Sequence, residues 1–193
     1  MASQVIQPRA SSPFDYKHHT KQEHKPSELL VFICEKEKNS DNVIIRNGDS
    51  VHYILKRQLF GKKYTLTSGD SNSSLIRAVT HRAVGYITLK SMVFAIHFNL
   101  SFPKFPRGVY TFEIDGVQYL WDYEMGSHMR CFTVQDTKLV AQIFSNSMNP
   151  SEESGDSIAW NARLAMVKEV TVSSGTLALI TMTGLLLMKK QIW

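Results

Sequence analysis

TLALITMTGLLLM, at residues 176–188, is the segment that most strongly constrains the architecture of this protein. Its thirteen residues carry no charge and are apolar on every side of a helix, so the helix has to be surrounded by other parts of the protein. At ~1.5 Å per residue this helix is about 20 Å long, short of the ~30 Å hydrocarbon core of a bilayer. Ser174 is a candidate N-cap, and Lys189 and Lys190 suit the negative end of the helix dipole. We therefore predict a buried helix over about residues 175–190, with a membrane anchor as the alternative.

The chain before this helix consists of short apolar runs separated by turn residues at intervals of about 8 to 12 residues, which is typical of an antiparallel barrel or sandwich. The runs are rich in Val, Ile, Tyr, Phe and Thr, which suit strands. They lie at residues 29–35, 42–46, 51–57, 63–67, 74–80, 84–90, 92–98, 108–114, 117–123, 129–134, 139–145 and 162–172. A closed barrel would wall in the helix and leave no sheet edge. We predict a mainly β protein, a closed antiparallel barrel of about twelve strands around the buried C-terminal helix.

The dipeptide Asp115–Gly116 predicts a two-residue type I′ hairpin turn. Because side chains alternate along a strand, such a turn sets one face of the hairpin as aromatic and the other as mostly polar. The pairs expected on the aromatic face are Ile114 with Val117, Phe112 with Tyr119, and Tyr110 with Trp121. We interpret this face as core rather than as a platform for stacking a ligand.

Two segments outside the barrel pattern are polar. Residues 1–28 contain three prolines and no periodicity, which indicates a flexible tail ahead of a barrel domain at residues 29–193. Residues 146–161 are predicted to form a long exposed loop that includes an acidic stretch at 151–156. The tail holds His18, His19 and His24, but nothing there sets a ligand geometry, so no metal site is expected.

Composition narrows the class of protein. The 193 residues are 43% hydrophobic with few Gly and Pro, which excludes a disordered or collagen-like chain. Only Cys34 and Cys131 are present, and the N-terminus has no apolar run after its first charges. We therefore expect reduced thiols and a cytoplasmic location. The net charge of +5 permits attraction to an anionic surface, but no basic stripe or helix motif supports nucleic-acid binding, which we do not expect.

No motif for catalysis or for a cofactor is found, so we expect a protein that is not an enzyme. His128 lies three residues from Cys131, and positions i and i+3 of a strand point to opposite faces, so the two are not expected to form a catalytic pair. The histidines His52, His81 and His97 show no spacing typical of metal ligands.

One basic segment is a candidate lipid-binding site. Four cations flank an apolar pair between two predicted strands, and the candidate residues are Lys56, Arg57, Phe60, Lys62 and Lys63. Cations near an anionic membrane contribute ~1 kcal/mol each, and a Phe can enter the headgroup layer. Secondary basic candidates are Arg77, Arg82 and Lys90. The alternative is a solvated hairpin whose Phe60 folds back onto the core.

The pattern resembles the tubby C-terminal-like superfamily, which includes tubby domains, LURP-one-related proteins and the phospholipid scramblase core, and is most similar to small fungal tubby-like proteins. The residues that carry the resemblance lie at 42–45, 53–55, 74–77, 84–87, 110–112, 115–121, 139–142 and 177–190. The resemblance implies a twelve-stranded barrel around a C-terminal helix. Tubby domains bind phosphoinositides and scramblases are associated with lipid movement. The tubby phosphoinositide motif is not matched residue by residue, so no site is carried over.

These observations favour a non-enzymatic module that binds lipid or phosphoinositide at the membrane periphery, or an adaptor. One alternative is a protein-interaction scaffold that binds a partner through the N-terminal tail or the 151–156 loop. The other is a β-barrel carrier whose interior holds a small ligand instead of the helix.

Overall fold

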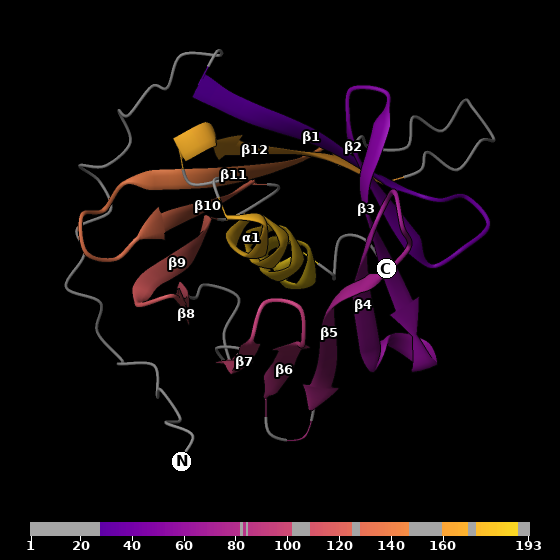
Figure 1. Ribbon diagram of the computed structural model, residues 1–193, viewed down its shortest axis with the longest axis horizontal. Coiled ribbons are helices and arrows are strands. Elements are labelled where there is room, and N and C mark those ends of the chain that lie inside the picture. Colours follow the sequence, from indigo (N-terminus) through magenta and orange to yellow (C-terminus); the bar gives the residue numbers. More distant parts are fainter. Residues whose placement is uncertain are drawn as a thin grey trace.

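The computed structural model in Figure 1 describes residues 28–81, 83, 85–101, 109–124, 128–146, 160–169 and 173–188. The predicted tail at residues 1–28, apart from its last residue Glu28, lies outside the described residues, as do the 151–156 loop, Arg82, Lys189 and Lys190.

The described residues form twelve strands, one α-helix and short 3₁₀ turns. The strands are β1 (Leu29–Lys36), β2 (Asn42–Asn47), β3 (Ser50–Gln58), β4 (Lys63–Ser68), β5 (Ser74–His81), β6 (Tyr86–Ser91), β7 (Ile96–Ser101), β8 (Val109–Ile114), β9 (Val117–Glu124), β10 (His128–Thr133), β11 (Leu139–Asn146) and β12 (Asn161–Val167). The helices are the turn η3 (Leu59–Gly61) and α1 (Ser174–Leu187).

All twelve strands join one antiparallel sheet that curls into a nearly closed barrel (Figure 1). The order is β7-β6-β5-β4-β3-β2-β1-β12-β11-β10-β9-β8, so the seam lies between β7 and β8. In the described part of this seam, β7 and β8 are not joined by backbone hydrogen bonds. Their side chains make contact instead, since the Phe98 ring stacks on the Phe112 ring with centroids 6.1 Å apart. The mainly β class, the strand number and the antiparallel arrangement predicted from the sequence are confirmed.

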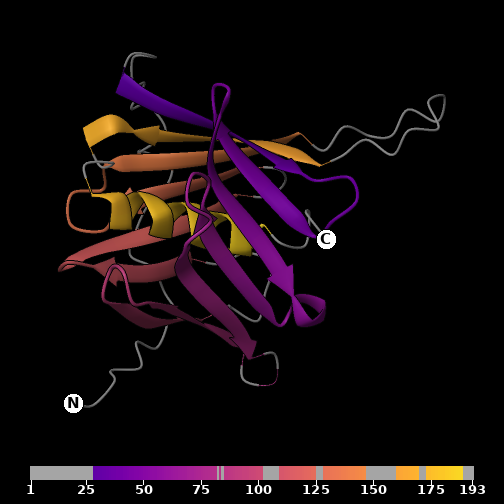
Figure 2. The same cartoon turned by 45° about the vertical axis from the view of Figure 1, so that its right-hand side comes forward.

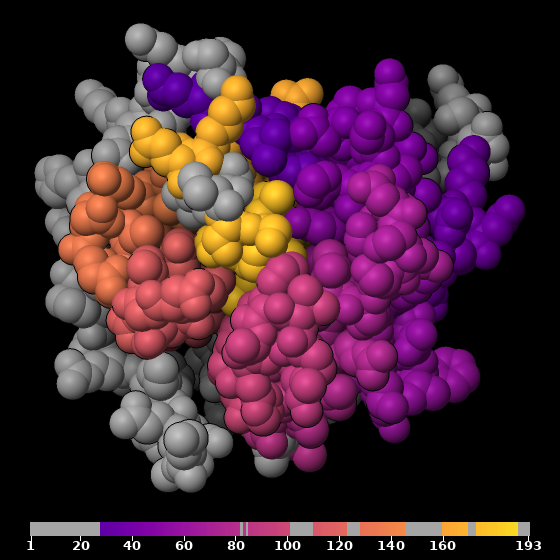
Figure 3. All heavy atoms as spheres, in the orientation of Figure 1, coloured from indigo at the N-terminus to yellow at the C-terminus, as the bar shows by residue number. Residues whose placement is uncertain are grey.

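Helix α1 lies in the middle of the barrel, and every residue from 175 to 186 is buried. In Figure 3 atoms of α1 come into view in the middle of one face, with strands around them. The hydroxyls of Thr181 and Thr183 donate to the carbonyls of Leu177 and Leu179, at 2.8 Å each, so these polar groups are satisfied within the helix. Among the described residues no helix is long and apolar enough to cross a membrane. The interpretation of the segment as a buried helix is confirmed.

The N-cap prediction was one residue off. Ser173, not Ser174, has extended backbone angles and accepts a hydrogen bond from the amide of Thr176. The extended backbone of Ser173 lets its hydroxyl reach the third amide of the helix, whereas Ser174 is already helical.

The Asp115–Gly116 hairpin is as predicted. Both residues have positive φ, at 50° and 78°, which is the signature of a type I′ turn. The three predicted cross-strand pairs are all present in the register of β8 with β9. Phe112, Ile114, Tyr119 and Trp121 are buried, so the aromatic face belongs to the core.

Two predicted strand boundaries were wrong. The apolar run 92–98 does not begin a strand, because residues 92–95 form the turn between β6 and β7 and Ala95 has a φ of +52°. Met92 and Val93 are apolar but exposed, so hydrophobicity misplaced the strand by four residues. The last strand, β12, ends at Val167 rather than at residue 172.

Candidate anion-binding surface

The outer face of β3, β4, β5, β6 and β7 carries a row of cross-strand partners, Lys56, Thr65, Arg77, Lys90 and His97, which we call the basic row. Tyr53 and Leu55 of β3 point into the core, so Lys56 between Leu55 and Arg57 points outward. Antiparallel pairing then places one member of the row on each successive strand. Side chains that are distant in sequence therefore become neighbours on one surface.

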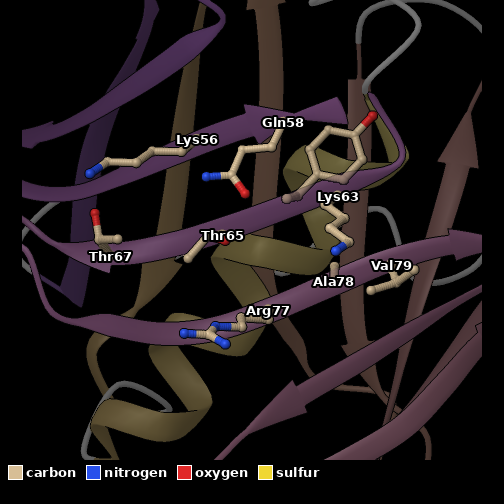
Figure 4. Close-up of a pocket in the computed structure, with 9 residues that line it drawn as sticks. Lys56, Gln58, Lys63, Thr65, Thr67, Arg77, Ala78 and Val79 are labelled. Carbon is tan, nitrogen blue, oxygen red and sulfur yellow. The ribbon is translucent and has the colours of Figure 1, made fainter. Parts of the chain in front are cut away.

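An open groove of about 570 Å³ lies against the start of this row. It is lined on β3 by Lys56 and Gln58, on β4 by residues 63–65 and Thr67, and on β5 by residues 77–79. Figure 4 shows Lys56, Thr65 and Arg77 on three successive strands, with Lys63 at the other end of the groove. The groove thus combines three cations with hydroxyl and amide groups that can donate hydrogen bonds.

Among the described residues, no carboxylate forms an ion pair with the cations of this face. Lys56 Nζ donates to Asn72 Oδ1 at 2.7 Å, and Arg77 Nε donates to Ser74 Oγ at 3.3 Å, so both bind neutral groups. Ion pairs formed within the described residues involve Arg46, Arg57, Arg130 and Lys138, and none involves a cation of the groove or Lys90. Arg77 and Lys90 are directly opposed on β5 and β6, a like-charge arrangement that is unfavourable without an anion.

The turn between β3 and β4 presents an exposed apolar pair beside the groove. Leu59 and Phe60 are 56% and 92% exposed, and both have positive φ, at 49° and 52°. The turn is joined to β5 by a hydrogen bond, because the Thr80 amide donates to the Lys62 carbonyl at 2.8 Å. Because Phe60 is exposed, it does not fold back onto the core as the alternative expected, whereas lipid binding by this hairpin stays a prediction.

The predicted site residues separate into two sets. Lys56, Lys63 and Arg77 line the groove, and Lys90 adjoins it on the next strand. Arg57 has the opposite side-chain direction to Lys56 and pairs with Asp41, its Nη1 lying 3.5 Å from Oδ1. Lys62 is exposed on the turn but does not line the groove.

Sequence reasoning did not identify Thr65, Thr67 and Gln58 as part of this surface, nor His97 at the end of the row. Strand alternation in the sequence is enough to place each of them on an outer face. The register of β4 with β5 and of β6 with β7 was needed to bring them beside the cations.

The two cysteines are free and fully buried, away from this surface. Burial raises the pKa of the Cys34 thiol to about 12, and it raises the pKa of Cys131 well above its usual value. Cys131 points into the core, whereas His128 stacks on the Phe144 ring with centroids 4.3 Å apart. Both thiols are thus protonated at neutral pH and poor nucleophiles.

Compared with known proteins, the chain matches no protein-family model, no curated protein and no solved structure. The resemblance to the tubby C-terminal-like superfamily stays a prediction, and the function has to be argued from the geometry of this surface.

Proposed function

We propose that this protein is a non-enzymatic module that binds anionic lipid at a membrane surface, with phosphoinositide headgroups as ligands of the groove. The observation that carries the proposal is the groove itself. Lys56, Lys63 and Arg77 converge on it without a carboxylate partner among the described residues, and an exposed Leu59–Phe60 pair lies beside it.

The groove suits a phosphorylated headgroup in size and in chemistry. Its volume of about 570 Å³ is within the range of ~300–1,000 Å³ typical of small-ligand sites. Lysine and arginine supply charged donors to phosphate oxygens, and Thr65 and Gln58 supply neutral donors that can fix orientation. An anion here would also offset the repulsion between Arg77 and Lys90. The predicted family resemblance points to the same class of ligand.

Of the two alternatives, the ligand carrier needs an empty interior, and α1 occupies that space. The segments assigned to the scaffold alternative, the N-terminal tail and the 151–156 loop, lie outside the described residues.

The test is co-sedimentation of the full chain with phosphatidylcholine vesicles that do or do not contain a phosphoinositide, at low and at high salt. We expect binding that requires the phosphoinositide and weakens with salt. Arg77→Gln is expected to weaken it about fivefold, since one cation contributes ~1 kcal/mol. Arg163→Gln is the matched control, because Arg163 is also exposed but belongs to β12. Absence of vesicle binding, or equal losses for both variants, contradicts the proposal.

A further inference from the structure

A second exposed apolar turn lies on the same wall of the barrel as the basic row. Met92 and Val93, in the turn between β6 and β7, are 84% and 62% exposed. The next residue of the turn, Phe94, lies against the first turn of α1. A Cβ added to Gly175 would be 3.3 Å from the Phe94 ring. Phe94 thus packs against the start of the helix while Met92 and Val93 face solvent.

The two apolar turns lie at opposite ends of the wall. Each strand from β3 to β7 runs antiparallel to the one before it, so the β3–β4 and β6–β7 turns fall at opposite ends, as Figure 2 shows. The basic row crosses the wall between them. Phe60 lies four residues beyond Lys56 toward one end of the barrel, and Met92 lies two residues beyond Lys90 toward the other end. At ~3.3 Å per residue the two turns are about 20 Å apart along the strands.

Both turns can reach one flat surface. Strands β3 and β6 are three steps apart in a barrel of twelve strands, which is about a quarter of its circumference. At ~4.8 Å per step the two strands are about 14 Å apart across the sheet. A plane laid against β4 and β5 therefore approaches both turns, with the basic row facing it.

We infer that the protein docks side-on, with the outer face of β3–β6 against an anionic bilayer and both apolar turns inserted in the headgroup layer. The inference rests on the proposed function and adds the orientation. Charge complementarity selects a bilayer, because two separate apolar turns on either side of a row of cations fit a laterally continuous anionic surface. Docking through the β3–β4 end alone would leave Met92 on the far side of the molecule.

Site-specific fluorescence quenching tests this orientation. Cys34 and Cys131 are buried and protonated, so a thiol-reactive fluorophore added to the folded chain labels an introduced cysteine. The variants are Leu59→Cys, Met92→Cys and, as the control, Gln135→Cys. Gln135 is exposed at the same end of the barrel as Met92 but lies between β10 and β11, on another wall. The full chain is mixed with phosphoinositide vesicles that contain a lipid-borne quencher.

Quenching at positions 59 and 92, but not at 135, is the expected result. Quenching at 59 without 92 means end-on docking and overturns the inference while the proposed function stands. Binding of the protein to vesicles without quenching at position 59 or 92 also overturns the inference. Absence of any vesicle binding overturns both, and binding of the wall to an acidic protein or a nucleic acid would then explain the basic row.

Discussion

The indole Nε1 of Trp121 in β9 donates a hydrogen bond to the hydroxyl of Thr183 in α1, 2.9 Å away, and both side chains are fully buried. The Thr183 hydroxyl in turn donates to the Leu179 carbonyl. The wall of the barrel and the central helix are therefore joined by a polar contact that has no competition from water, which defines the position of the helix along the barrel.

Thr183→Val is expected to destabilise the fold by about 1–3 kcal/mol, because the Trp121 indole loses its acceptor in a buried site. Thr181→Val is the matched control, since the Thr181 hydroxyl is equally buried and its hydrogen bond is to the Leu177 carbonyl of its own helix. Urea denaturation measures both free energies of unfolding. Equal losses for the two variants would count against the role of Trp121 in anchoring α1 to strand β9.

Gly184→Ala is expected to destabilise the protein by about 1–3 kcal/mol despite the better helix propensity of Ala. A Cβ at this position would lie 2.4 Å from Ile143 Cδ1 and 2.8 Å from Trp121 Cζ2. Ile143→Val removes the closer atom, so the double variant should lose less stability than the sum of the two single variants. Thermal and urea unfolding of all three variants provide the measurement, and strict additivity would refute the clash.

Lys90→Glu is expected to raise stability by about 0.2–1 kcal/mol and to weaken vesicle binding. The substitution turns the like-charge pair with Arg77 into an opposite-charge pair across β5 and β6. Gains in thermal stability and losses in lipid affinity should thus come from one change. A destabilised Lys90→Glu variant would show that the two side chains do not interact, and Arg163→Glu controls for net charge.

The buried thiols predict a loss of stability at high pH. A Cys thiol has a pKa of 9.0 in the unfolded chain, whereas burial raises the pKa of Cys34 to about 12 in the fold. The fold favours the protonated form, so the stabilising contribution is complete below pH 9 and is lost as the pH rises from 9 towards 12. Tyr53, whose pKa burial also raises to about 12, acts in the same direction.

Unfolding free energies measured from pH 8 to 11 check this dependence. The slope should be shallower for Cys34→Ala, whatever the change in absolute stability that the smaller side chain causes. Thiol-reactive dye at pH 8 should label neither native cysteine in the folded chain and both in urea. Rapid labelling of the folded chain would contradict the burial of the thiols.

Much of the fold could be predicted because its signals are local. The alternation within β3 and β8, the Asp115–Gly116 turn and the charge-free run of α1 are each readable from a few consecutive residues. The turn at residues 92–95 could not be recognised, because its run of apolar residues has the composition expected of a strand. Only the tertiary structure shows that Phe94 packs on Gly175 while Met92 and Val93 stay exposed.

A barrel of about twelve strands around the C-terminal helix was predictable from the chain of residues alone, because an all-round apolar helix too short for a bilayer must be buried by strands. The four cations of residues 56–63 were also evident from the sequence. The folded barrel was needed to show that Arg77 and Lys90 join Lys56 on one surface, and that Arg57 pairs with Asp41 instead. The physical reason is that strand alternation is local, whereas the register between strands depends on packing across the whole barrel.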